Sequence, residues 1–145
     1  MKSTLFFILL ATIGLIACKK ENTKVTQSSA IVGRWSYIKD TVWVYKNGAT
    51  SFMEGYKYTS GEYVQFNADG TGRDYRTTFT YLFAGDKLTI KYASFTKGGT
   101  PYDAETEVSQ VTGITGNNMV LFYDYRNYSN GKLTDGNKVI EYLSK

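Results

Sequence analysis

The sequence predicts an all-β domain in which short antiparallel strands follow one another and close into a barrel of eight to ten strands. Thr, Val and Tyr are abundant, and the chain holds 13 tyrosines; such β-branched and aromatic residues fit a pleated, half-buried surface. Its 14 glycines recur between apolar stretches, whereas proline occurs once. No segment longer than about ten residues carries the apolar period of a helix.

The first strand begins after Ile31, in "IVGRWSYIKDTVWVYKNG". Trp35 and Tyr37 alternate with polar neighbours and therefore share one face. Residues 42–45 are apolar on both faces, which is expected where a strand is covered on both sides or changes sheet. Asn47-Gly48 then predicts a tight turn.

Two hairpins follow the less regular segment 49–61. The first, "YVQFNADGTGRDY", has its turn at Asp69-Gly70, with Tyr75 on the returning strand. The second, "FTYLFAGDKLTIKY", turns at Gly85-Asp86. Alternation predicts that both hairpins turn apolar residues toward one side: Val64, Phe66, Phe79, Tyr81, Phe83, Leu88, Ile90 and Tyr92.

The last third of the chain continues the pattern. We expect a Gly-rich loop at 96–103, a strand from Ala104, a turn at 116–118, a strand from Met119, a polar loop at 127–137 and a terminal strand at 138–144. Barrel closure removes the two exposed edges that such a meander would leave. An immunoglobulin-like sandwich is the rival fold, but the chain lacks a cysteine pair and Greek-key spacing.

The N-terminus is typical of a secretory signal peptide, assigned to residues 1–17. Lys2 precedes an apolar run from Leu5 to Ala17 that ends in small residues. A permanent membrane-spanning helix needs about 20 apolar residues, so this run is too short.

The end of that run, "LIAC", resembles the processing box of bacterial lipoproteins. The resemblance implies that Cys18 receives a diacylglyceryl group and becomes the first residue of the mature chain. The alternatives are a cysteine without a role and a free thiol. Residues 18–30 are polar and predict a flexible tether behind the lipid. The expected location is the cell envelope, as a lipid-anchored protein of a Gram-negative outer membrane.

Residues 31–145 resemble the lipocalin-like domain of Bacteroidota lipoproteins, a calycin-type barrel. Four stretches carry the resemblance: "IVGRWSY", "YVQFNADGTG", "YLFAGDKLTI" and "VTGITGNNMVLFY". Gly33 and Trp35 match the Gly-x-Trp motif of that group, which implies that the indole closes the barrel floor. In that group a late arginine often packs on this indole, which makes Arg126 the candidate here, although Lys138 lies nearer the end of the chain.

A barrel of about eight strands either fills with side chains or holds one small ligand. The aromatic content predicts a lining suited to an apolar or amphipathic molecule, with tyrosine hydroxyls for hydrogen bonds. The alternative is that the same rings pack the interior. The expected lining residues are Tyr37, Phe66, Phe79, Tyr81, Leu88, Ile90 and Phe122.

The composition disfavours catalysis, cofactors and metal sites. No histidine is present, and the single cysteine is assigned to the lipid. Asp103, Glu105 and Glu107 alternate and are expected on a solvated outer face, with carboxylate catalysis or weak calcium binding as minor alternatives. The net charge of +4 is scattered, which argues against nucleic-acid binding.

The sequence therefore predicts a non-enzymatic, membrane-anchored, lipocalin-like protein that binds a small apolar or amphipathic molecule. The alternative is a module with a packed barrel that binds a surface glycan or a protein through exposed tyrosines. Tyr125 and Tyr128 in "YDYRNY" are the candidate surface aromatics.

The anchor has a direct test in the variant Cys18→Ser. Without the thiol no thioether to the lipid can form, so we expect the chain to leave the membrane fraction of a bacterial host. Processing of the unchanged chain should be blocked by globomycin. Membrane retention of Cys18→Ser at the level of the unchanged protein would contradict the assignment.

Overall fold

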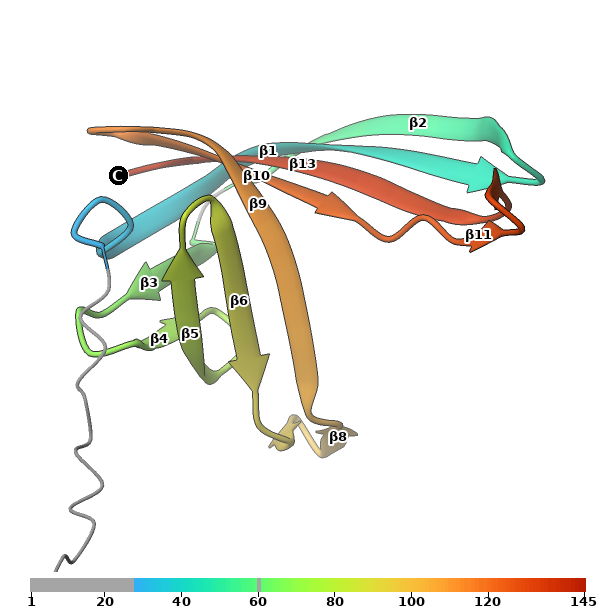
Figure 1. Cartoon of the computed structure of the whole chain (residues 1–145). Helices are drawn as coiled ribbons and strands as arrows, with labels where there is room; N and C mark the ends of the chain where they lie inside the picture. The colour runs from blue at the N-terminus through green and yellow to red at the C-terminus, as the bar shows by residue number, and fades with distance from the viewer. Residues whose placement is uncertain (1–27, 60) are drawn as a thin grey trace, which may run out of the picture.

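The computed structural model describes residues 28–59 and 61–145, and every regular element in these ranges is a β-strand. Eight strands form a barrel: β1 (Gly33–Lys46), β3 (Tyr63–Phe66), β4 (Thr71–Asp74), β5 (Thr78–Ala84), β6 (Lys87–Tyr92), β9 (Glu105–Thr115), β10 (Asn118–Asp124) and β13 (Gly136–Ser144) (Figure 1). The predicted all-β fold is confirmed. The described ranges hold no helix long and apolar enough to cross a membrane.

Each barrel strand pairs antiparallel with its neighbours in the order β1-β3-β4-β5-β6-β9-β10-β13, and β13 returns to β1. The first part of β1, Gly33 to Ser36, pairs with β3. From Ser36 to Tyr45 its other edge pairs with β13. This last pairing closes the barrel, as the meander required.

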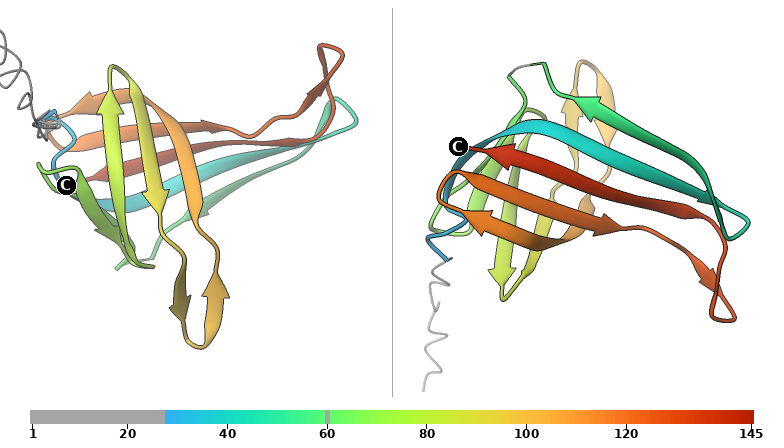
Figure 2. Two further views of the ribbon diagram at one scale, coloured as in Figure 1. Left: turned by 60° about the horizontal axis from the view of Figure 1, so that its bottom comes forward. Right: turned by 90° about the horizontal axis from the view of Figure 1, so that it is seen from above.

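Beyond the barrel, four strands continue as a projecting sheet (Figures 1 and 2). Here β2 (Ala49–Lys57) replaces β3 beside β1, and β13 and β10 run along the other side. The apolar residues 42–45 lie where β1 has changed neighbours, and all four are partly buried. Strand β2 forms the free edge, and each of its residues is exposed.

Two small hairpins correct the expectation that residues 96–103 and 127–137 are loops. Strands β7 (Phe95–Lys97) and β8 (Thr100–Tyr102) form the first, and β11 (Tyr128–Ser129) and β12 (Lys132–Leu133) the second. Gly98 and Gly99 both have positive φ, as do Asn130 and Gly131. Two consecutive residues of this conformation make the turn whose twist matches a hairpin.

The Gly-x-Trp motif closes one end of the barrel. The Trp35 side chain is fully buried, and its Nε1 donates a hydrogen bond of 2.8 Å to the carbonyl oxygen of Ile31. The Nζ of Lys145 lies 4.5 Å from the centroid of the indole. The Gly33 backbone has a φ of +132° beside the Lys145 side chain, a conformation that glycine adopts easily.

The basic residue on the indole is therefore Lys145 rather than Arg126 or Lys138, which corrects the prediction. Arg126 forms an ion pair with Asp124, and Lys138 lies over the ring of Trp43. Lys145 directly follows β13, and this end of β13 lies beside Trp35. Lys138 lies farther along β13 and Arg126 beyond the end of β10, away from the indole.

Apolar side chains fill the barrel above Trp35. The aromatic rings meet edge to face, with centroids 4.9 Å apart for Phe66 and Tyr81 and 5.5 Å apart for Phe79 and Tyr92. The other buried apolar residues of this core are Ile31, Val64, Leu88, Ile90, Val111, Met119, Leu121, Tyr123 and Leu143. This half of the barrel is packed rather than hollow.

The tightness of this core can be tested at Gly72. A methyl group there would overlap the ring of Phe79 and lie 2.5 Å from the carbonyl oxygen of Gln65. We expect Gly72→Ala to lower the free energy of unfolding by about 1–3 kcal/mol through overpacking, measured by urea denaturation.

Gly116→Ala is the matched control, because no atom lies within 4 Å of the added methyl group. It should change stability by less than about 0.5 kcal/mol. If both substitutions changed the free energy of unfolding equally, the core would have room for a side chain at residue 72, and the prediction would be wrong.

Candidate functional site

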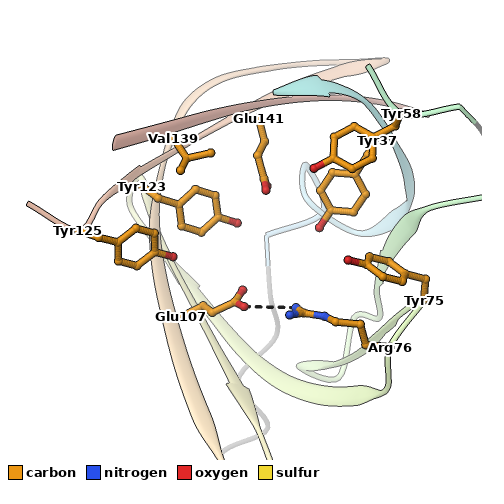
Figure 3. A pocket seen from close by; sticks show the side chains of 9 residues that line it. All are labelled: Tyr37, Tyr58, Tyr75, Arg76, Glu107, Tyr123, Tyr125, Val139 and Glu141. Atoms are coloured by element: carbon orange, nitrogen blue, oxygen red, sulfur yellow. Dashed lines mark hydrogen bonds and ion pairs between the residues drawn. The ribbon is translucent and has the colours of Figure 1, made fainter. Parts of the chain in front are cut away.

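A half-enclosed cavity of about 140 Å³ occupies the end of the barrel away from Trp35 (Figure 3). Its wall combines five tyrosine rings with three charged side chains and one apolar residue. The lining residues are Tyr37, Tyr58, Tyr75, Arg76, Glu107, Tyr123, Tyr125, Val139 and Glu141. The cavity is a polar, aromatic site above an apolar core.

Strand alternation places these side chains. On β1 the inward positions run from Trp35 to Tyr37, and on β10 from Leu121 to Tyr123. On β13 they run backward along the chain from buried Leu143 to Glu141. Because inward residues recur at every second position, each strand passes from apolar to polar as it approaches the open end.

A β-bulge at Ile38 shapes one wall of the cavity. The β1–β13 register shifts between Tyr37 and Lys39, so that Asp40 lies opposite Glu141. The Asp40 carboxylate accepts a hydrogen bond of 3.1 Å from the Tyr58 hydroxyl, and the Tyr58 ring lies 5.2 Å from that of Tyr37. The bulge thereby brings a residue from the end of β2 over the cavity.

The opposite wall is an ion-pair network around Arg76. Asp74 is buried, and its carboxylate accepts hydrogen bonds from the backbone N–H groups of Arg76 and Thr77. The Arg76 guanidinium lies 2.9 Å from Asp74 and 3.2 Å from Glu107, and it donates to the Tyr92 hydroxyl at 2.7 Å. Two carboxylates and a hydroxyl hold this cation in place.

Glu141 lies beside Asp40 on the β1–β13 wall, across the cavity from Arg76 (Figure 3). Its Oε2 is buried and has no hydrogen-bond partner among residues 28–59 and 61–145. Burial raises the pKa of Glu141 from its ordinary value of 4.5 to about 7, although a hydrogen bond from Tyr123 lowers it. The negative charges of Glu107 and Asp40 raise the pKa further. Near neutral pH the carboxyl therefore exists in both forms.

Burial affects other groups of the cavity in the same direction. It raises the pKa of the Tyr37 and Tyr123 hydroxyls well above the ordinary value of 10. It also raises the pKa of Glu107, against the opposing effect of Arg76. The tyrosines consequently remain neutral and can both donate and accept hydrogen bonds.

The residues predicted to line a ligand site are distributed over three environments. Tyr37 lines the cavity. Four others, Phe66, Tyr81, Leu88 and Ile90, are buried in the packed core. Phe79 is also in the core and borders an open groove of about 670 Å³ on the outer side of β4, β5 and β6. Phe122 alternates with inward Leu121 and Tyr123, so it lies on the outer face near Lys138.

The two candidate surface aromatics also separate. Tyr125 is 45% exposed and lines the cavity, with its ring stacked on Tyr123 at 5.9 Å. Tyr128 is 56% exposed and lies on β11, outside the cavity. Cys18 lies outside the described residues.

Glu107 corrects the expectation of a solvated outer face. It lies on the inward side of β9 together with buried Ser109 and Val111, and it pairs with Arg76. The segment "KVIEYLS" has a similar pattern, because Glu141 lies on the same face of the strand as Val139 and Leu143. A carboxylate that alternates in step with apolar inward residues is the sequence signal that could have located the site, and neither Glu107 nor Glu141 was predicted from it.

Fold and cavity together define an antiparallel β-barrel protein with a polar site at one end. Comparisons with protein-family models, curated proteins and solved structures return no match for this chain. Within the described part of the chain, no group of three or more acidic residues is arranged to hold a metal ion.

The buried carboxyl of Glu141 predicts a pH-dependent stability. A carboxyl whose pKa is higher in the folded state stabilises the fold below its unfolded pKa, and this contribution is lost as pH rises through the folded pKa. As the pH rises from 4.5 to about 7, we expect ionisation of Glu141 to lower the free energy of unfolding by roughly 3 kcal/mol. This corresponds to about 1.36 kcal/mol for each pH unit between the two pKa values.

The variant Glu141→Gln should therefore unfold at higher urea concentration than the unchanged protein at pH 8, and the two should agree near pH 4. Glu54→Gln removes the same charge from exposed strand β2 and should show no such difference. A Glu141→Gln variant whose pH profile parallels that of the unchanged protein would contradict the buried titration.

Proposed function

We propose that this chain is a membrane-anchored, non-enzymatic β-barrel protein that binds the head group of a small amphipathic molecule at the cell envelope. The observation that carries the proposal is the polar cavity above a filled core. Its wall holds tyrosine hydroxyls and a buried carboxylate oxygen without a partner. A bound molecule supplies the hydrogen bonds that the wall lacks.

The size of the cavity limits the ligand. Its volume of about 140 Å³ resembles that of an engineered cavity of about 150 Å³ that holds benzene in another protein. Sites for drug-sized molecules are larger, about 300–1,000 Å³. The cavity therefore accepts a head group, while the remainder of the ligand leaves through the open side.

The described chain begins at the closed end of the barrel, which bears on where the proposed lipid would attach. Residues 28–31 form a turn in which the Ile31 N–H bonds to the Ser28 carbonyl oxygen, and buried Ile31 contacts Trp35. The chain thus enters the barrel at its closed end. A lipid on Cys18 would therefore be linked to the closed end of the barrel through the predicted tether, and the cavity would lie at the opposite end.

Binding without reaction agrees with the state of the charged groups. Arg76 already contacts Asp74, Tyr92 and Glu107, so it is a fixed part of the wall. The chain contains no histidine to serve as an imidazole base. The site is accordingly proposed to recognise its ligand and leave it unchanged.

Filling the cavity tests this function. Val139→Phe adds a ring at the lining position of Val139, whereas Val108→Phe adds the same ring at the exposed position of Val108 on β9. We expect ligands found by native mass spectrometry and dye displacement to bind the unchanged protein and Val108→Phe, and to bind Val139→Phe at least tenfold more weakly. Equal binding to all three proteins, or no binding to any, would contradict the proposal.

Glycan or protein binding through the surface is the second candidate function, favoured by exposed rings on β2 and on the β11–β12 hairpin. The most exposed are Phe52, Tyr56 and Tyr128, and sugars stack on such faces. Tyr128→Ala is the discriminating variant because Tyr128 lies outside the cavity. Loss of a signal on a glycan array in Tyr128→Ala, with small-molecule binding retained, would favour this function. A Tyr125→Ala variant should affect both assays.

A further inference from the structure

We propose that the head group held in the cavity is a protonated primary amine, with its ammonium nitrogen against the Glu141 carboxylate. This inference rests on the proposed function and names the chemical class of its ligand. Four observations carry it: the charge around the cavity, an unpartnered acceptor, the arrangement of the rings and the state of Arg76.

The charge around the cavity is negative. Five carboxyl groups lie in or beside the open end of the barrel: Asp40, Glu62, Asp74, Glu107 and Glu141. Glu62 joins them because it precedes β3 on the inward alternation of Val64 and its Oε2 is also buried without a partner. Arg76 is the one basic residue of the lining.

Lysines on the adjoining strands do not offset these charges. Lys39 lies over the ring of Tyr142, and Lys138 lies over the ring of Trp43. Both lysines alternate with inward residues of β1 and β13 and therefore lie on the outer side. A cation entering the cavity meets an excess of negative charge.

The unpartnered Oε2 of Glu141 favours a ligand that carries a hydrogen-bond donor. A buried acceptor without a partner costs free energy, and a donor on the ligand removes that cost. An ammonium group has three N–H donors. Figure 3 shows the Glu141 carboxylate and the Tyr37 and Tyr123 hydroxyls directed into the same space, so one nitrogen can reach more than one of these oxygens.

The tyrosine rings suit a cation with an apolar stem. One pair, Tyr37 and Tyr58, has its centroids 5.2 Å apart, and a second pair, Tyr123 and Tyr125, is stacked at 5.9 Å. Aromatic faces attract cations, most strongly where water is excluded. The rings also cover the carbon atoms next to the nitrogen.

Other ligand classes fit less well. An anion would approach Glu107 and Glu141, and the Arg76 guanidinium is already engaged by Asp74, Tyr92 and Glu107. A metal ion needs several ligands, and the described ranges contain no suitable group of three. A quaternary ammonium has no N–H group, so it would leave the Glu141 oxygen unpaired.

The amine requires the ionised form of Glu141, so binding is coupled to pH. The groups facing Glu141 are Tyr37 and Asp40 of β1, Tyr58 after β2, Arg76 of the β4–β5 turn, Glu107 of β9 and Tyr123 of β10. With the pKa of Glu141 at about 7, the affinity for an amine should be roughly 30-fold lower at pH 5.5 than at pH 8. Binding at pH 5.5 releases the Glu141 proton.

The experiment compares three probes of one shape by calorimetric titration at pH 8: benzylamine, benzyl alcohol and benzyltrimethylammonium. The protein is the full chain purified in detergent, with the variants Glu141→Gln and Glu54→Gln. We expect benzylamine to bind the unchanged protein and Glu54→Gln at least tenfold more tightly than either other probe. Glu141→Gln should lose this preference while remaining folded, which its urea denaturation curve checks.

Three results would overturn the inference: no binding of benzylamine, equal binding of benzylamine and benzyl alcohol, or an unchanged preference for benzylamine in Glu141→Gln. Equal binding of amine and alcohol that Val139→Phe abolishes would leave the proposed function standing and reject only the amine. Absence of any ligand in the dye and mass-spectrometric assays would reject the proposed function itself.

Discussion

The pairing of β1 with β13 is the contact on which the barrel, the projecting sheet and the cavity all depend. It joins the ends of the chain from Ser36–Ser144 to Tyr45–Gly136 and closes the barrel. Beyond the point where β3 leaves β1, the same pairing continues into the projecting sheet. The bulge at Ile38 interrupts its register once and turns Asp40 toward Glu141. One strand pair thus supplies closure, extension and part of the cavity wall.

The two ends of the barrel differ in what they contribute to stability. At the closed end, Trp35, Phe66 and Leu88 have at most 1% of their surface exposed, and burial of such side chains contributes about 1.5–3 kcal/mol each. At the open end, the partly buried carboxyls destabilise the folded state whenever they ionise without a partner. Arg76 places one cation against both Asp74 and Glu107, whereas no ion pair is formed by Glu141 within the described residues. Apolar burial at the closed end therefore offsets the cost of the carboxyls at the open end.

Much of the fold follows from local sequence signals, because alternation and turn chemistry act over a few residues. Asp69-Gly70 and Gly85-Asp86 correctly marked two hairpin turns. The cavity was harder to predict because its walls come from six separated segments, and no short-range pattern reports which of them meet. Glu107 shows the difficulty: its alternation was visible, but the inward direction of that face depended on the pairing of β9 with β6 and β10. Tyr58 entered the site only through the bulge, which the sequence does not signal.

Glu141 lowers the stability of the barrel when it is ionised. A neutral residue on β13 would remove a buried charge and its desolvation cost, so packing alone gives no reason for a glutamate between Val139 and Leu143. Asp74 is different, because four hydrogen bonds from Arg76, Thr77 and Tyr92 make its carboxylate part of the fold. Glu141 lacks such partners on one oxygen, and its free side is the cavity. Groups that destabilise the fold without making a structural contact in return concentrate at functional sites. This contrast is why we propose Glu141, rather than Asp74, as the residue that recognises a ligand.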